Sequence, residues 1–164
     1  MSQANDELSQ EIKQTARNAL DELRMILEPF ATPDSNLQTV LAAYRERCIK
    51  PLERLGITLH WSMSGLPDTN GLTAQNNLDI LRIIQEAVTN AVNHGKPKII
   101  EVECACEHER ITIIVTNSGG CSYNGESSGY GISNMQKRAL QLKDGTLQIH
   151  SLVDGAQLVL SFIG

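Results

Sequence analysis

Apolar and polar positions follow one another most regularly between Leu78 and Gly95, in the stretch LDILRIIQEAVTNAVNHG. Apolar residues recur there every three or four positions, which predicts a helix whose buried stripe contains Leu81, Ile84, Val88, Ala91 and Val92. Just upstream, Asn76 or Asn77 is the expected N-cap. The pattern therefore predicts an amphipathic helix packed on a core.

The polar residues of the same stretch are Glu86, Asn90, Asn93 and His94. On a helix these four side chains fall close together on a face beside the apolar stripe. A carboxylate and an amide one turn apart both offer oxygen, and Mg²⁺ takes a few protein oxygens together with water and phosphates. A solvated helix face is the plainer interpretation of this pattern alone, so the decision depends on the residues that follow.

The remaining patterns divide the chain into an N-terminal helix within residues 1–30, expected over 5–30, and a core domain over 37–164. Asp34 or Ser35 in the linker is a candidate N-cap. Core helices are expected over 37–55, ended by Gly56, and over 132–142, and strands over 57–63, 99–107, 110–117, 146–152 and 156–162. Hairpin-linked strands with helices on one face predict an α+β fold, a two-layer α/β sandwich with a mixed, mostly antiparallel sheet.

Composition narrows the function classes. Of the 164 residues, 41% are hydrophobic and 20% charged, which is typical of a globular protein, and the net charge of −5 argues against a nucleic-acid surface. The N-terminus has no signal-peptide core and no apolar run reaches membrane-spanning length, so we expect a cytoplasmic protein. The four cysteines lack zinc-site spacing, and Cys104 and Cys106 are expected to act as small apolar residues.

Glycines bracket the loop over residues 118–131. Gly119 and Gly120 follow a predicted strand, and Gly129 and Gly131 precede the helix expected from Ile132. Glycines let backbone N–H groups approach an anion, and a helix N-terminus favours negative charge. A flexible turn is the plainer interpretation of each glycine pair, but the order of acid–amide helix, hairpin, glycine loop and helix indicates a nucleotide site.

These residues also carry a family resemblance. QEAVTNAVNHG (85–95) resembles the N box of the ATP-binding domain of sensor histidine kinases, in the Bergerat-fold superfamily. VTNSGG (115–120) stands where that family has its first glycine box, and SGYGISNMQKRALQLKDGTLQIHS (128–151) resembles its second box and the next hairpin. The phrase GxGIxNMxxRA and the short lid are similar to the nitrate-sensor and thermosensor subclass. ARNALDELRMILEPF (16–30) is similar to the second dimerisation helix of that subclass.

The resemblance implies a Bergerat fold that binds ATP with Mg²⁺ and transfers the γ-phosphoryl group to an imidazole. It implies that Asn90 binds Mg²⁺, that Glu86 is catalytic and holds the water shell of the metal or orients the attacking group, and that Asn93 and His94 reach phosphate oxygens. Asn117 and Gly119 would lie by the adenine. The segment Gly129, Tyr130, Gly131 and Ile132 would bind the cofactor, with its two glycines cradling phosphates.

Three positions depart from the family pattern. Asn117 replaces the aspartate that accepts the adenine amino proton, Cys121 replaces a glycine of the first box, and Ala156 replaces the threonine after the last glycine. The loss of charge weakens the bond from residue 117 to about half. Three functions stay open: a kinase domain that binds ATP weakly, a docking or regulatory module with little nucleotide binding, and an anti-sigma-type serine kinase.

The resemblance also implies partners. The N-terminal helix would form a homodimer, although packing on its own domain is the alternative, and a response regulator with a helix-turn-helix output domain would receive the phosphoryl group. The phosphoacceptor helix is missing, because His60, His94, His108 and His150 all lie in the catalytic-type domain. We therefore expect a fragment of a longer sensor that does not autophosphorylate, contacts membrane only through upstream segments and binds no nucleic acid directly.

Overall fold

The structure is a computed structural model that describes residues 36–67, 71–120 and 130–164, together with Gln10 and Lys13. Gln10 and Lys13 are helical and exposed, and the rest of the predicted N-terminal helix lies outside the described residues. The candidate caps Asp34 and Ser35, as well as Cys121 and Gly129, also lie outside them.

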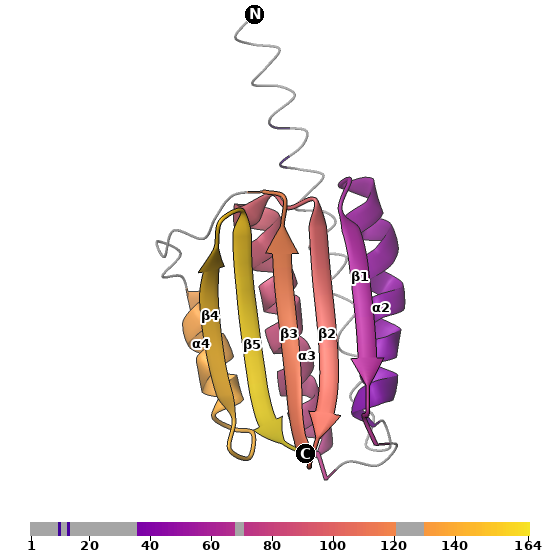
Figure 1. Ribbon diagram of the computed structural model, residues 1–164, viewed down its shortest axis with the longest axis vertical. Coiled ribbons are helices and arrows are strands. Elements are labelled where there is room, and N and C mark those ends of the chain that lie inside the picture. The colour runs from indigo at the N-terminus through magenta and orange to yellow at the C-terminus, as the bar shows by residue number, and fades with distance from the viewer. Residues whose placement is uncertain (1–9, 11–12, 14–35, 68–70, 121–129) are drawn as a thin grey trace, which may run out of the picture.

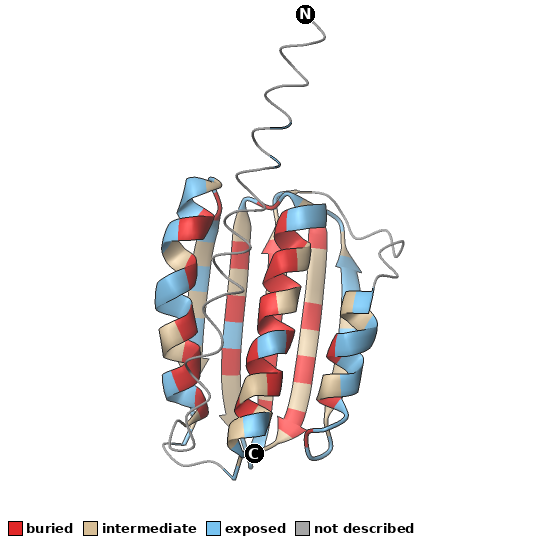
Figure 2. Ribbon diagram, turned by 180° about the vertical axis from the view of Figure 1, so that it is seen from behind, coloured by how far each residue is buried: buried red, intermediate tan, exposed pale blue. Residues whose placement is uncertain are grey.

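The described residues form a five-stranded sheet with the α-helices on one of its faces (Figures 1 and 2). The strand order is β1-β2-β3-β5-β4, in which β1 and β2 are parallel and the other pairs antiparallel. This confirms the predicted α+β two-layer sandwich and its mixed sheet. The elements are α2 (Leu37–Arg54), β1 (Thr58–Ser64), α3 (Ala74–Asn90), the π-helical turn η2 (Ala91–Gly95), β2 (Ile99–Glu107), β3 (Arg110–Ser118), α4 (Tyr130–Ala139), β4 (Thr146–Leu152) and β5 (Gly155–Ile163).

The core lies between the sheet and the helical layer, in which α3 occupies the middle position between α2 and α4 (Figure 2). Residues of β3 alternate between buried and less buried positions, as expected for a strand with one covered face. At one side of the layer, the ring of Tyr44 in α2 packs edge-on against Trp61 of β1, with 6.2 Å between ring centroids. The predicted stripe of α3 is buried, which confirms the periodicity argument: Leu81, Ile84, Val88 and, continuing into η2, Ala91 and Val92.

Both predicted helix N-caps were placed wrongly. The side chain of Asn36 caps α2 and accepts a hydrogen bond of 2.8 Å from the Thr39 N–H. Helix α3 begins earlier than expected, after the cap Thr73. There Thr73 Oγ1 accepts from the Asn76 N–H at 3.1 Å, and Asn76 Oδ1 accepts from the Thr73 N–H at 3.0 Å, which forms a reciprocal capping box. Asn77 is instead a buried residue of the first turn.

The predicted turns follow the expected chemistry more closely. Gly56 ends α2 with a φ of +73° and donates its N–H to the Glu53 carbonyl at 2.9 Å. The β2–β3 hairpin turns at His108 and Glu109, whose φ angles are 48° and 65°. A two-residue hairpin loop with two left-handed residues matches the right-handed twist of the strands, which is why the hairpin tolerates this conformation without glycine.

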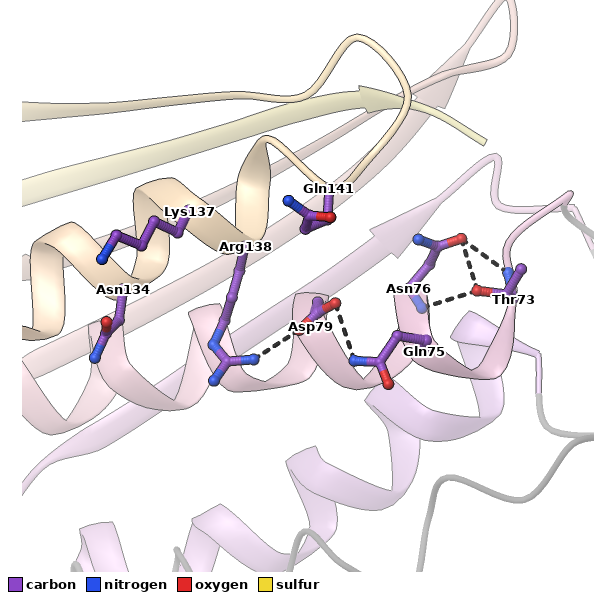
Figure 3. Close-up of a pocket in the computed structure, with 8 residues that line it drawn as sticks. All are labelled: Thr73, Gln75, Asn76, Asp79, Asn134, Lys137, Arg138 and Gln141. Carbon is purple, nitrogen blue, oxygen red and sulfur yellow. Dashed lines mark hydrogen bonds and ion pairs between the residues drawn. The ribbon is translucent and has the colours of Figure 1, made fainter.

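A buried ion pair fastens α4 to α3 (Figure 3). The Asp79 side chain is 6% exposed, and its Oδ1 accepts from the Arg138 guanidinium at 2.6 Å. Its other oxygen accepts from Gln75 Nε2 at 3.1 Å. A buried carboxylate is stable only when its oxygens are paired, so this contact fixes where α4 lies along α3.

We expect Arg138→Ala to lower the free energy of unfolding by about 2–3 kcal/mol, because it leaves the buried Asp79 carboxylate without its charged partner. Urea unfolding followed by circular dichroism measures the change. Lys137→Ala is the matched control: it removes an exposed positive charge from the same helix and should change stability by at most about 0.5 kcal/mol. Equal effects of the two variants would contradict the structural importance of the pair.

Candidate functional site

The acid–amide pair lies near the C-terminal end of α3. Glu86 and Asn90 are half-buried and one helical turn apart. The α-helix then ends, and Asn93 and His94 belong to the π-helical turn η2, where both are exposed. The expected regular helix up to Gly95 is therefore wrong in its last turn. A π-turn bonds residues five apart, so these two residues do not continue the α-helical face of the first two.

Glu86 lies directly against the first described turn of α4. A Cβ atom added at Gly131 would collide with Oε1 of the Glu86 carboxylate, so any larger residue would displace the end of this side chain. Helix α4 already includes Tyr130 and Gly131, two residues before its predicted start at Ile132. Tyr130 is 90% exposed, whereas Ile132 packs on the core.

Asn117 occupies the edge of the site at the end of β3. It is 8% exposed and pairs with Ala156 of β5 in the sheet register. Its amide nitrogen lies 2.8 Å from the position a Cβ would take on Gly95 and 3.1 Å from that on Gly155. Two of the three departures from the family pattern are thus neighbours on adjacent strands, and neither supplies a charge or a hydroxyl group.

The glycine turn after β3 differs from its predicted role. Gly119 has a φ of +77°, and its N–H donates to Oδ2 of Asp154 at 3.0 Å. The Gly120 N–H donates to the backbone carbonyl of Asp154 at 3.1 Å. Both N–H groups are therefore used within the protein and are not offered to an anion. Sequence reasoning missed Asp154, whose only signal was its place before a glycine in a hairpin turn.

Three segments meet at one end of the sheet, where strands begin and end. They are the end of η2, the glycine turn at Gly119 and Gly120, and the β4–β5 turn. A Cβ on Gly120 would collide with the Gly95 carbonyl oxygen and lie 2.6 Å from that of Lys96, so the end of η2 touches the glycine turn, which Asp154 links to the β4–β5 turn. Figure 1 shows that β3 and β4 end, and that β2 and β5 begin, at this end of the sheet. The end of η2, which continues α3, thus touches the glycine turn. Because α3 and α4 both belong to the helical layer, the acid–amide pair and Gly131 lie on the same side of the sheet (Figure 2).

Two cysteines and two histidines outside the candidate site lie in the core and on the surface, respectively. Burial raises the pKa of Cys48 and of Cys104 to about 12, so both thiols stay neutral, which for Cys104 agrees with its predicted role as a small apolar residue. His60 and His150 are exposed, as expected, and His60 Nδ1 lies 3.4 Å from Glu101. Among the described residues, no group of three His, Cys, Asp or Glu side chains could hold a metal ion, and no helix is long and apolar enough to cross a membrane.

A hollow with a volume of about 570 Å³ lies between the N-terminal half of α3 and the C-terminal half of α4 (Figure 3). It surrounds the ion pair of Asp79 and Arg138 and lies about two helical turns before Glu86 along α3. Its lining is polar and consists of Thr73, Gln75, Asn76, Asp79, Asn134, Lys137, Arg138 and Gln141. It is separate from the acid–amide pair.

No family model matches the chain. Sequence relatives are the sensor histidine kinases LnrJ of Bacillus subtilis (29% identical over 141 residues, 85% of this chain and 34% of that protein), MctS of Rhizobium johnstonii (30% over 149 residues, 85% and 31%) and DesK of Bacillus subtilis (28% over 142 residues, 84% and 35%). The chain spans about a third of the length of these curated relatives.

Solved structures show the same fold. The histidine kinase domain of the blue-light activated kinase EL346 from Erythrobacter litoralis matches with a TM-score of 0.63 and 13% identity over 92% of this chain and 73% of that one. The catalytic domain of histidine kinase ThkA matches with a TM-score of 0.57 and 13% identity over 77% and 90%. The chain thus has the fold of histidine kinase catalytic domains, and its relatives support an ATP-binding domain of that type. The subclass stays a prediction.

We expect Gly131→Ala and Glu86→Ala to be coupled by about 1 kcal/mol or more in a double-mutant cycle of unfolding free energies. In the parent chain the added methyl group displaces the Glu86 carboxylate, whereas in the Glu86→Ala background it only improves helix propensity and should stabilise. Ser133→Ala, at an exposed position of the same helix, is the control and should be additive with Glu86→Ala. Additivity of the Gly131 variant would show that the two groups are not in contact.

Proposed function

We propose that this chain is the ATP-binding catalytic domain of a two-component sensor histidine kinase, which transfers the γ-phosphoryl group of Mg–ATP to a histidine outside this domain. The observation that carries the proposal is the contact between Glu86 and Gly131. It joins the helix with the acid–amide pair to the helix that follows the glycine loop. The sequence relatives support the same activity.

The donor set of the site fits a magnesium nucleotide. The Asn90 amide would supply an oxygen ligand to Mg²⁺, and the Glu86 carboxylate would hold a water of its shell. Few protein ligands are needed because the nucleotide phosphates and water complete the coordination of this ion. Asn93 and His94, exposed in η2, are the proposed partners of phosphate oxygens, together with the first turn of α4 at Tyr130, Gly131 and Ile132.

Catalysis would rest on position and charge. With Mg–ATP bound, the metal would neutralise charge on the phosphates, and the chain itself would do the orienting. Glu86, which lies close to Gly131 of α4, would orient the attacking imidazole or a metal-bound water. Asn117 and Gly119 would lie by the adenine base, from which the neutral amide of Asn117 accepts a weaker hydrogen bond than a carboxylate would.

The partners are part of the proposal. The segment over residues 1–30 would dimerise and present the domain to a phosphoacceptor helix, and a response regulator with a helix-turn-helix output domain would take the phosphoryl group. The domain would work in the cytoplasm, where ATP is available, and reach a membrane only through other segments. The net charge of −5 disfavours direct nucleic-acid binding.

A second candidate function is a docking or regulatory module that binds little nucleotide. The observation in its favour is the pair formed by Asn117 and Ala156, which are register partners at the base end of the site. Asn117 lacks the charge, and Ala156 lacks the hydroxyl group, that the family pattern has there. Nucleotide affinity distinguishes the two functions.

We expect millimolar Mg–ADP to raise the melting temperature by several degrees, because a ligand that binds only the native state adds about 2.7 kcal/mol at 100 times its Kd. Differential scanning calorimetry with and without EDTA measures the shift and its dependence on the metal. Asn90→Ala should remove the metal dependence, whereas Gln148→Ala, an exposed amide on β4, should behave as the parent chain does. No shift at millimolar Mg–ADP would favour the docking module.

We expect Asn117→Asp to tighten Mg–ADP binding by about 1 kcal/mol, or roughly fivefold, because it creates a charge-assisted bond to the base. The free variant should be less stable than the parent chain, since the new carboxylate is buried without ligand. Isothermal titration measures the affinity, with Asn134→Asp as the control of equal charge change. An unchanged affinity in the folded variant would place the weakness of the site elsewhere.

A further inference from the structure

The β4–β5 turn holds the glycine turn through a single residue. Oδ2 of Asp154 accepts the Gly119 N–H at 3.0 Å, and the backbone carbonyl of Asp154 accepts the N–H of the next residue, Gly120, at 3.1 Å. Two successive amides of one turn therefore depend on one residue of another turn, which is 35 positions away in the sequence.

The opposite side of the glycine turn is closed by the Lys98 side chain and by the backbone of Gly95 and Lys96. A Cβ on Gly119 would lie 2.9 Å from Cβ of Lys98, and one on Gly120 would meet the carbonyl groups of Gly95 and Lys96. The left-handed φ of Gly119 needs contacts that hold it, because an unrestrained glycine samples many conformations. The Asp154 side chain supplies such a contact from the β4–β5 turn, as the acceptor of the Gly119 N–H.

The glycine turn is close to the base end of the proposed nucleotide site, which is the end that would hold the adenine base. Asn117 precedes Gly119 by two residues, and Ala156 follows Asp154 by two residues. These two residues face each other across β3 and β5, and Gly155 packs against the backbone of Asn117. Movement of the glycine turn would therefore move the backbone beside Asn117.

We propose that Asp154 is a positioning residue of the nucleotide site: its carboxylate holds the backbone of Gly119, and through it the base end around Asn117, in the binding geometry before the ligand arrives. This inference rests on the proposed nucleotide-binding function. A turn that is already ordered binds a ligand more tightly, because its conformational entropy is not lost on binding. Asp154 itself is exposed, so its loss should affect binding more than global stability.

The test compares Asp154→Ala, Asp154→Asn and the control Glu103→Ala, which removes an exposed carboxylate from the uncovered face of β2. Isothermal titration gives the Kd of Mg–ADP, and NMR amide exchange without nucleotide reports on Gly119 and Gly120. We expect Asp154→Ala to weaken binding about three- to tenfold and to accelerate exchange at Gly119 more than at Gly120, whose acceptor is backbone. Asp154→Asn keeps an acceptor oxygen and should restore most of the affinity, and Glu103→Ala should match the parent chain.

Each other outcome decides the question. If folded Asp154→Ala binds Mg–ADP with the parental Kd, the inference is wrong while the proposed function stands. If Asp154→Ala does not fold, the parent chain itself decides: a protected Gly119 amide without nucleotide supports the inference, and an unprotected one overturns it. A parent chain that does not bind Mg–ADP overturns the proposed function, and the role of Asp154 in nucleotide binding falls with it.

Discussion

The burial of α3 between its two neighbouring helices and the sheet is the constraint on which the other features depend. One stripe of this helix belongs to the core, and the adjacent face carries Glu86 and Asn90. Because the core fixes the rotation of the helix, it also fixes the direction of these polar groups. The ion pair between Asp79 and Arg138 then fixes the position of α4 along α3, with its first turn beside the Glu86 carboxylate.

Features that depend on sequence-local periodicity could be predicted well. The strands, the β2–β3 turn and the buried stripe of α3 follow from alternation and helical spacing, so the fold class and its one-sided helical layer could be inferred. The caps were missed because several Asx, Ser and Thr residues near each helix start are suitable caps, and local sequence does not distinguish Asn36 and Thr73 from their neighbours. The π-turn had no signal, since its sequence continues an ordinary helical pattern.

The candidate site could be predicted only in part, because its contacts cross between elements. The Glu86–Asn90 spacing is local and was visible, but the approach of Gly131 to Glu86 depends on how α4 packs on α3. The Asp154 contact joins two turns that are far apart in sequence, and it contradicts the expectation of an anion only for the amides of Gly119 and Gly120. Asn117 and Ala156 were recognised separately as departures, and the register of β3 and β5 makes them a single neutral patch.

The last strand in the sequence is not at the edge of the sheet, since β5 lies between β3 and β4. During synthesis on a ribosome, β3 and β4 leave the exit tunnel with no partner between them, and the sheet closes only when β5 arrives. Non-local pairing of this kind is slow to form. The nascent domain would therefore acquire the neighbourhood of Asn117 and Ala156 in its final folding step, which delays any ligand-competent state until translation has passed β5.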